Sequence, residues 1–413
     1  MMNMKLWRDI EERKLLSSMV MILVSILTYT ILVICTPIVY GEIMDERIYV
    51  TAGKLYIADP RNVLKVNWEH PPLAKYIIGL LWIVFNGSTR LINYMIGIIT
   101  ILIFTRLLNL IDWRSRFTMY LVLFLLSADM VFAHVTQYSL LDTYMMPFML
   151  ASFYFFLKFL NRNSMKYLLF SSLLVGLAIA CKFTAIYLLL TVLIYIVFMY
   201  RKGLKFVSTA YLVLIVTTLS TFTIPYLPLL VTGVSVNEVI MNIFNAVSYH
   251  QHLHFYGTYV SLQSLLTFFF KVGIWEVYSC TMFMYPNVTL VSSSEWTYTG
   301  VYLHIYYGLG ALSWYMFLPS LIFMVYIILK RAKSIGTRES FIVFSAIIWA
   351  ISLLHGDIEW YYYDVLPVYY MLLGLVLRNI KDRWKILLIV MSIIYDILIL
   401  SIRSWYITLP ILS

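Results

Sequence analysis

Long apolar segments joined by charged connections dominate this chain and fix the kind of molecule that it can form. Eleven segments have the length and the apolar character of membrane-spanning helices. They cover residues 16–39, 91–110, 117–135, 140–159, 167–181, 183–200, 206–230, 301–329, 341–355, 360–377 and 386–402. The sequence therefore predicts an all-α polytopic membrane protein with about 11 transmembrane helices.

The composition also indicates a membrane protein, because 62% of the 413 residues are hydrophobic and only 12% are charged. A water-soluble domain could not bury so many hydrophobic residues. No segment resembles a soluble domain, a repeat or a low-complexity tract, so we expect one transmembrane catalytic unit over 1–413. The first apolar run is longer than the core of a signal peptide and lacks a small-residue cleavage site, which favours a retained first span. Three cysteines, an odd number, predict no disulfide framework.

Basic residues predict the orientation of the chain. With the N-terminus in the cytoplasm, 21 of the 30 Lys and Arg residues fall in inner loops or at inner helix ends, as the positive-inside rule requires. The net charge of +10 then reflects membrane flanks, and we expect no nucleic-acid partner. Acids and histidines gather on the outer side, where two long loops, 41–90 and 231–300, are expected to carry short interfacial helices. The seven histidines are His70, His134, His250, His252, His254, His304 and His355.

The first outer loop carries the clearest chemistry. The chain has no phosphate-binding glycine loop and no inner domain that could hold a nucleotide, so an enzyme of this design must draw an activated substrate from the bilayer. Glu42, Asp45 and Glu46 follow the first span directly, at the mouth of a potential cavity, and a carboxylate there can accept a proton from an attacking hydroxyl. The alternative, a solvated loop whose acids pair with Arg47 and Lys54, stays open from this triplet alone.

The end of this loop, His70-Pro71-Pro72-Leu73-Ala74-Lys75, places a rigid proline pair before an amphipathic stretch from Leu73 to Phe85. This stretch is too short to span a bilayer and is expected to lie on the interface. Lys75 would then reach headgroup depth and suit a lipid phosphate, and the alternative is a lysine that merely snorkels.

At these residues the chain resembles a known family. Asp45-Glu46 followed by His-Pro-Pro-Leu-x-Lys is similar to the first outer loop of the protein O-mannosyltransferases (dolichyl-phosphate-mannose protein mannosyltransferases, glycosyltransferase family 39). These belong to the GT-C membrane glycosyltransferases, which use polyprenyl-phosphate sugars. Weaker matches follow in the family's order, and they are "TQYSLLDTYMMPF", "GLAIACKFTAIYLLL", "SYHQHLHFYGTYVS" and "EWYYYDVLPVYYMLLGL".

Two departures from the family limit what the resemblance implies. Gln137 stands where the family usually has Arg, five residues before Asp142, which puts one phosphate or carboxylate partner in question. The β-trefoil insertion of eukaryotic members is absent from the second outer loop, so the chain resembles a prokaryotic form. Prokaryotic relatives include enzymes that glycosylate lipids, and the acceptor therefore stays open.

The resemblance implies an inverting transfer of a hexose, by default mannose, from a polyprenyl (dolichyl) phosphate to an acceptor hydroxyl on the outer face of a prokaryotic cell membrane. Protein Ser/Thr is the expected acceptor, and a lipid-linked glycan or another lipid is the alternative. Asp45 would be the catalytic base, and Glu46 would orient a neighbour or the acceptor.

Further site residues follow from the same matches. Lys75, Lys182 and Gln137 are the candidates for binding the donor phosphate. The candidates for binding the sugar or the acceptor are His70, Asp142, His250, His254, Trp360 and Tyr362. Several of these candidates have a plainer alternative: Lys182 as a helix-end marker, Asp142 as a hydrogen-bonded span residue, and Trp360 with Tyr362 as part of an interfacial aromatic belt.

No metal site is predicted. His250, His252 and His254 spread by about 200° around a helix, so they cannot converge on one ion there. The resemblance requires no cofactor beyond the lipid-phosphate sugar, while the carboxylates of the first loop leave a divalent ion open. The rival function from another class is a secondary transporter, because Asp142 and Asp396 lie within spans. Against it, the sequence has no inverted repeat and no paired broken helices.

Overall fold

The computed structural model describes residues 4–36, 44–198, 203–255, 268–269, 276–278, 301–306, 311–331, 336–353, 359–401 and 406–412. The α-helices are α1 (Met4–Cys35), α2 (Met44–Ala58), α3 (Leu73–Val84), α4 (Arg90–Leu108), α5 (Arg116–Ser127), α6 (Met130–Val135), α7 (Leu141–Arg162), α8 (Met165–Cys181), α9 (Ile186–Phe198), α10 (Leu204–Thr223), α11 (Leu227–Val231), α12 (Val236–Phe255), α14 (Phe317–Arg331), α15 (Thr337–Ser352), α16 (Glu359–Leu377) and α17 (Asp382–Ser401). Short 3-10 helices are η1 (Pro60–Leu64), η2 (Phe183–Ala185), η4 (Ile224–Tyr226) and η5 (Leu312–Met316).

Every predicted span contains a helix, and the helical, membrane-protein fold class is confirmed. Within the described residues, five helical segments are long and apolar enough to cross a membrane. They are Leu16–Cys35, Arg90–Leu108, Leu141–Arg162, Leu204–Val231 and Leu312–Lys330. Shorter apolar helices fill most of the other predicted spans, and α3, expected to be too short to cross, has 12 residues.

Two predicted spans differ from the structure. Segment 117–135 divides into α5 and α6, because Asp129 interrupts the helix and caps the next one, its Oδ1 accepting from the amide of Phe132 at 3.1 Å. Segment 301–329 does not begin as a helix, since Val301–Tyr306 form strand β2. The aromatic and β-branched residues of this stretch favour a strand, and its apolar character conceals this.

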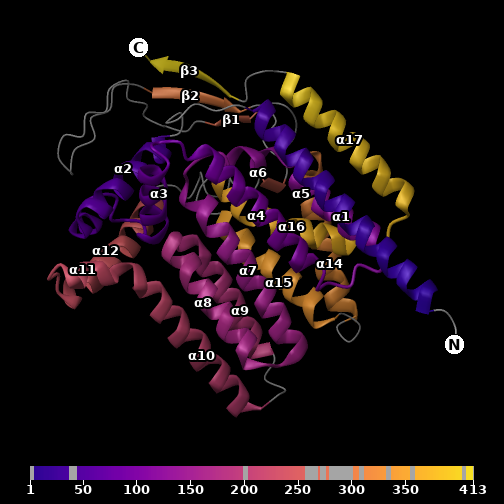
Figure 1. The fold of residues 1–413 in the computed structure, drawn as a ribbon, viewed down its shortest axis with the longest axis horizontal. Coiled ribbons are helices and arrows are strands. Elements are labelled where there is room, and N and C mark those ends of the chain that lie inside the picture. Colours follow the sequence, from indigo (N-terminus) through magenta and orange to yellow (C-terminus); the bar gives the residue numbers. More distant parts are fainter. Residues whose placement is uncertain are drawn as a thin grey trace.

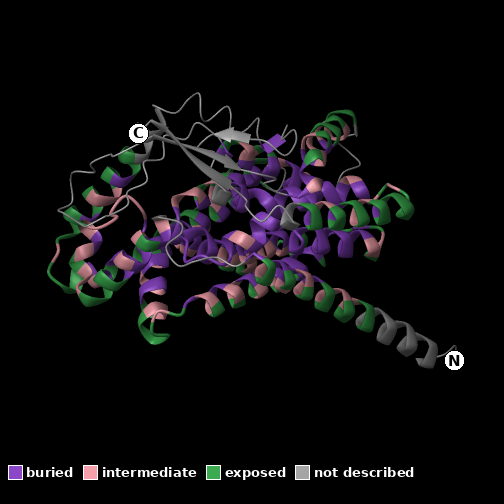
Figure 2. Ribbon diagram, turned by 90° about the horizontal axis from the view of Figure 1, so that it is seen from above, coloured by how far each residue is buried: buried purple, intermediate pink, exposed green. Residues whose placement is uncertain are grey.

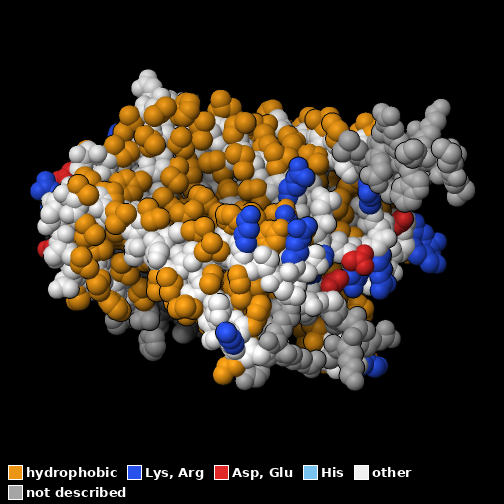
Figure 3. Space-filling model, turned by 60° about the horizontal axis from the view of Figure 1, so that its bottom comes forward, with side chains coloured by type: hydrophobic (Ala, Val, Ile, Leu, Met, Phe, Trp, Pro, Cys, Tyr) orange, Lys and Arg blue, Asp and Glu red, His pale blue; other side chains and the backbone are white. Residues whose placement is uncertain are grey.

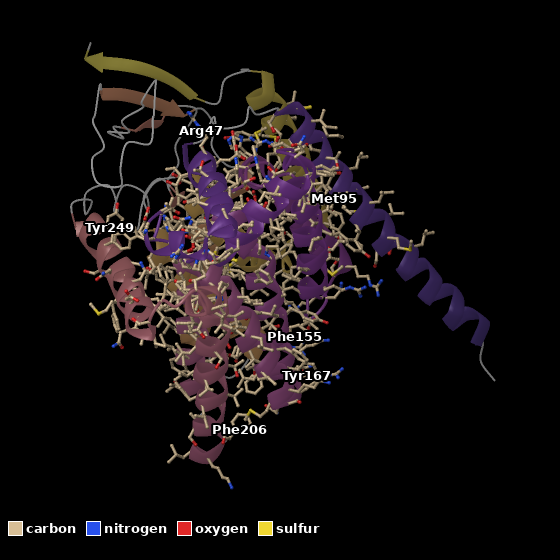
Figure 4. All side chains as sticks on the ribbon, turned by 60° about the vertical axis from the view of Figure 1, so that its left-hand side comes forward. Arg47, Met95, Phe155, Tyr167, Phe206 and Tyr249 are labelled. Carbon is tan, nitrogen blue, oxygen red and sulfur yellow. The ribbon has the colours of Figure 1, made fainter. Side chains whose placement is uncertain are left out.

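A small antiparallel sheet joins distant parts of the chain. Strand β2 pairs with β1 (Glu276–Tyr278) on one side and with β3 (Tyr406–Leu412) on the other. In Figure 1 these strands lie at the top of the molecule and the α2–α3 pair lies at the upper left, whereas the beginnings of α10 and α1 lie lower. Figure 4 shows the same separation between Arg47 on α2 and Phe206 on α10.

The core surrounds α16, whose residues from Tyr362 to Leu375 are all buried, against α5, α14 and α15. Figure 2 shows this buried centre, with exposed residues along the outer sides of α1 and α17. Those exposed residues are largely apolar, as Leu23 (66% exposed) and Ile397 (60% exposed) illustrate. Hydrophobic side chains also cover much of the face in Figure 3. An apolar outside over an apolar core is the arrangement that a bilayer solvent permits.

Candidate active site

Helices α2 and α3 of the first outer loop pack closely through two glycines. A Cβ atom added at Gly53 would lie 2.2 Å from the backbone oxygen of Lys75, and one added at Gly79 would lie 2.2 Å from the carbonyl carbon of Gly53. No side chain fits at such distances. The glycine pair therefore sets the spacing between α2, which begins next to Asp45, and α3, which follows the His-Pro-Pro segment.

Lys75 lies fully buried beneath the loop that precedes α3. Its ammonium donates to the backbone oxygens of Asn67 (2.5 Å) and His70 (2.8 Å) and to Asn67 Oδ1 (3.1 Å). Loss of solvent lowers the pKa of Lys75 to about 7, although the charge of Glu69 acts in the opposite direction. Lys75 therefore ties the loop before α3 to the helix itself. A direct contact between Lys75 and a lipid phosphate stays a prediction.

Asp45 is the second residue of α2 and keeps part of its surface open to solvent. The hydroxyl of Tyr49, one turn further on, donates to Asp45 Oδ2 at 3.4 Å. Loss of solvent and the nearby charge of Asp142 raise the pKa of Asp45 to about 6, while Lys182 acts to lower it. A carboxylate with this pKa is ionised at neutral pH and is a stronger base than an ordinary aspartate, which suits it to accept a proton.

Glu46, the next residue, is fully buried and faces the protein interior. Both of its carboxylate oxygens accept from Arg90 at 2.7 Å, and Oε1 also accepts from the backbone N–H of Ser139 at 2.8 Å. A two-bonded arginine–carboxylate pair is rigid and directional. Glu46 therefore joins the first turn of α2 to α4 and to the segment before α7, and this places Asp45.

Arg90 is a site residue that the sequence interpretation missed. Besides Glu46, its guanidinium donates to the backbone oxygen of Gln137 and lies 5.1 Å from the centre of the Tyr138 ring. One signal in the sequence pointed to it, because Arg90 stands at the outer end of a span, against the positive-inside preference.

Gln137 lies close to this guanidinium but faces α1. Its side-chain amide donates to Thr36 Oγ1 at 3.0 Å and to the backbone oxygen of Ala133 at 3.2 Å. Its own backbone oxygen also accepts from Asn93 Nδ2 at 3.1 Å. Gln137 thus ties α4 and α6 to the end of α1, and its role at a donor phosphate stays a prediction.

A second buried cluster lies within electrostatic range of Asp45. Lys182, directly after α8, forms an ion pair with Asp142 in the first turn of α7, and its Nζ lies 3.6 Å from Asp364 Oδ2 on α16. Asp364 Oδ2 also accepts from the hydroxyl of Thr184 at 3.0 Å. All three charged side chains are at most 6% exposed. Asp142 and Lys182 were predicted site residues, whereas Asp364 lies within the quoted segment "EWYYYDVLPVYYMLLGL" but was not named as a site residue.

His70 and Trp68 connect the loop to its surroundings. The His70 ring meets the Tyr49 ring edge to face, with 5.8 Å between the ring centres. Since Tyr49 lies one turn of α2 from Asp45, this contact brings His70 near the proposed base. Trp68 meets Tyr249 of α12 at 5.5 Å, which brings the second outer loop against the first, and Figure 4 shows Tyr249 on that helix. The predicted residues His250 and His254 lie on α12 and Trp360 lies on α16, but their side chains lie outside the described residues.

Tyr362 occupies an aromatic cluster instead of an open wall. It is fully buried, stacks on Phe268 at 5.8 Å and meets Trp314 edge to face at 5.6 Å. The Trp314 indole in turn donates to buried Asp129 at 2.7 Å. Sugar contact by Tyr362 would require these rings to separate, so its binding role stays a prediction.

Metal ligands do not gather in the part of the chain that the structure describes, since no group of three His, Cys, Asp or Glu side chains there could hold an ion. In the described cluster around Lys182, one ammonium instead faces the two carboxylates of Asp142 and Asp364. The candidate site therefore combines the proton-accepting carboxylate of Asp45 with a buried ion-pair cluster.

The sequence gives a partial match to one known family. A sequence model of the family described as dolichyl-phosphate-mannose-protein mannosyltransferase matches residues 69–227, less than half of the chain. No curated protein matches the chain.

Solved structures show the same fold. The archaeal oligosaccharyltransferase AglB from Archaeoglobus fulgidus, solved with an inhibitory peptide and a dolichol-phosphate, superposes with a TM-score of 0.57 at 13% identity over 95% of this chain. ArnT from Cupriavidus metallidurans, bound to undecaprenyl phosphate, superposes with a TM-score of 0.57 at 16% identity over 91% of this chain. An oligosaccharyltransferase from Archaeoglobus fulgidus solved with Zn and sulfate gives 0.57 at 14% identity over 94%. The chain spans 56%, 63% and 53% of those proteins, respectively.

Proposed function

Because the chain has the fold of the GT-C membrane glycosyltransferases, we propose that it is an inverting glycosyltransferase that moves a hexose from a polyprenyl-phosphate sugar to an acceptor hydroxyl. The observation that carries this proposal is Asp45: a partly open carboxylate with a pKa of about 6, on a helix anchored by the neighbouring residue Glu46. Such a group is suited to general-base catalysis.

The reaction is a single displacement. Asp45 accepts the proton of the acceptor hydroxyl. At the same time the oxygen of that hydroxyl bonds to the anomeric carbon, and the bond from that carbon to the phosphate oxygen breaks. The lipid phosphate leaves with the electron pair, and the configuration at the anomeric carbon inverts. Base catalysis by a positioned carboxylate contributes roughly 10²–10⁴-fold to such a rate.

Positive charge near the departing phosphate completes this mechanism. Lys182 is one candidate among the described residues, alongside Lys75 and Gln137, since its ammonium lies beside Asp142 and within electrostatic range of Asp45. A cation placed where negative charge develops stabilises the transition state. In this proposal Asp142 holds Lys182 until the donor arrives.

Mannose is the proposed sugar, with dolichyl or another polyprenyl phosphate as its carrier, and protein Ser/Thr is the proposed acceptor. The family match over residues 69–227 supports these choices. The second acceptor is a lipid-linked glycan or lipid. We place the site on the outer face of a prokaryotic cell membrane with the N-terminus in the cytoplasm. The separation of α2 and α3 from the beginning of α10 in Figure 1 supports that orientation.

One experiment tests the proposal and distinguishes the acceptors. Membranes containing the protein are incubated with polyprenyl-phosphate mannose labelled in the sugar, and the label is followed into protein and glycolipid. Label in protein supports the first acceptor, and label in glycolipid supports the second. If label enters neither, and the protein supports substrate counterflow in proteoliposomes, the proposed enzymatic function is wrong and the protein is a transporter.

A further inference from the structure

The cluster around Lys182 contains one carboxylate more than the single lysine can neutralise. Asp142 and Asp364 both face its ammonium, and their two carboxyl groups also lie within hydrogen-bonding reach of each other. Asp364 is 1% exposed, and its Oδ1 has no hydrogen-bond donor among the described residues. A buried carboxylate in this state is costly, so its presence calls for an explanation beyond packing.

The positions of these groups suggest what Asp364 does. Lys182 stands directly after α8 and faces Asp142 and Asp364 of the bundle, and its charge also acts on Asp45 of the first outer loop. An ammonium that turned fully toward Asp45 would stabilise its charged form and weaken it as a base. Asp364 is anchored on α16 and is fixed further by the hydroxyl of Thr184, so it provides a rigid second partner on the bundle side.

We propose that Asp364 is a positioning residue: together with Asp142 it holds the Lys182 ammonium within the bundle and so keeps it from neutralising Asp45. This inference rests on the proposed function, because it assigns Asp364 a role in keeping the catalytic base available. It assigns no contact between Asp364 and the substrate.

The charged and titratable groups around Asp45 determine the sign of the expected effect. Asp142 and Glu69 raise the pKa of Asp45, whereas Lys182 and the Tyr49 hydroxyl lower it. Releasing Lys182 from Asp364 strengthens the influence of the lysine on Asp45. The pKa of Asp45 should then fall, by about one pH unit for a charge that moves closer at this range.

The test variant is Asp364→Leu, which removes both carboxylate oxygens and introduces a larger apolar side chain. Asp364→Glu is the conservative rescue. Asp396→Asn is the matched control, since Asp396 is a buried aspartate on α17 with an equally unpartnered oxygen, and no ion pair joins it to Lys182 among the described residues.

Two readouts separate this inference from the proposed function. The first is the pH profile of kcat/KM for transfer from polyprenyl-phosphate mannose. We expect its acid limb to move to lower pH by about one unit in Asp364→Leu, with a lower plateau, because a weaker base transfers a proton more slowly. Asp364→Glu should recover most of the shift, and Asp396→Asn should show none.

The second readout needs no transfer activity. A water-soluble carbodiimide with an amine labels protonated carboxyls, and peptide mapping follows Asp45 as the pH changes. The labelling midpoint of Asp45 should fall in Asp364→Leu and stay unchanged in Asp396→Asn. An unchanged midpoint overturns the positioning role, whether or not the protein transfers sugar. A wild-type protein that does not transfer sugar overturns the proposed function, and the labelling result still decides the role of Asp364.

Discussion

The carboxylate of Glu46 and the guanidinium of Arg90 form a two-bonded ion pair, with 2.7 Å at each oxygen, between the first turns of α2 and α4. The carboxylate is fully buried, whereas the arginine side chain is 30% exposed. The residue next to Glu46 is Asp45, so the placement of the proposed base depends on a membrane-spanning helix.

Replacing Arg90 by Met should therefore damage both stability and transfer. The change leaves the Glu46 carboxylate buried without its partner, which costs about 3 kcal/mol in comparable cases. Thermal unfolding in detergent measures the stability loss, and transfer from polyprenyl-phosphate mannose measures the activity. Arg47→Met is the control, because Arg47 is exposed on α2 next to Glu46, and its replacement should leave both stability and transfer nearly unchanged. Equal effects from the two variants would contradict the anchoring role of Arg90.

Asp45→Asn should lower the rate of sugar transfer by roughly 10²–10⁴-fold, the contribution of a positioned general base. Stability should change little, because Asp45 is partly exposed and its one described hydrogen bond is long, at 3.4 Å. Rate and unfolding temperature are measured on the same purified preparation. A variant that kept the wild-type rate would remove Asp45 from the mechanism.

Transfer should fall as the pH drops below about 6, because the pKa of Asp45 is raised to that value and the base must be ionised. Replacing Lys182 by Met should move this acid limit to higher pH, since Lys182 lowers the pKa of Asp45. The pH profile of kcat/KM checks both statements. A limit that stayed in place, or moved to lower pH, would show that Lys182 does not act on the base.

Gly79→Ala should push α3 away from α2, because the added Cβ would meet the carbonyl carbon of Gly53 at 2.2 Å. We expect a loss of about 1–3 kcal/mol in stability, typical of overpacking, and reduced transfer, since the loop held by Lys75 moves with α3. Leu80→Ala is the control on the same helix, because Leu80 is 54% exposed. Indistinguishable Gly79→Ala and Leu80→Ala proteins would mean that the helix spacing does not matter.

The sequence could predict the helices because a bilayer demands long apolar runs with charged ends. The prediction of a helix from an apolar segment was wrong at Val301–Tyr306, because hydrophobic content alone cannot distinguish a strand from a helix. It also passed over the interruption at Asp129, whose polar side chain caps α6 within an otherwise apolar segment.

For the site, local motifs pointed to Asp45, Glu46 and Lys75 but not to their surroundings. Arg90 lies 44 residues beyond Glu46 and Asp364 lies 319 residues beyond Asp45, and only folding brings them to the site. Lys75 shows the reverse case, since its motif suggests an exposed headgroup contact while the structure gives all three N–H donors to the loop. Partner choice depends on tertiary contacts that no spacing in the sequence reveals.

The most direct test of the central claim compares purified wild-type protein with Asp45→Asn on polyprenyl-phosphate mannose, in membranes that supply acceptors. The measurement is the amount of transferred mannose together with its anomeric configuration. We expect wild-type protein to transfer the sugar with inversion and to release lipid phosphate, and we expect Asp45→Asn to transfer almost none. Equal transfer by both proteins, or a product with retained configuration, would contradict the central claim.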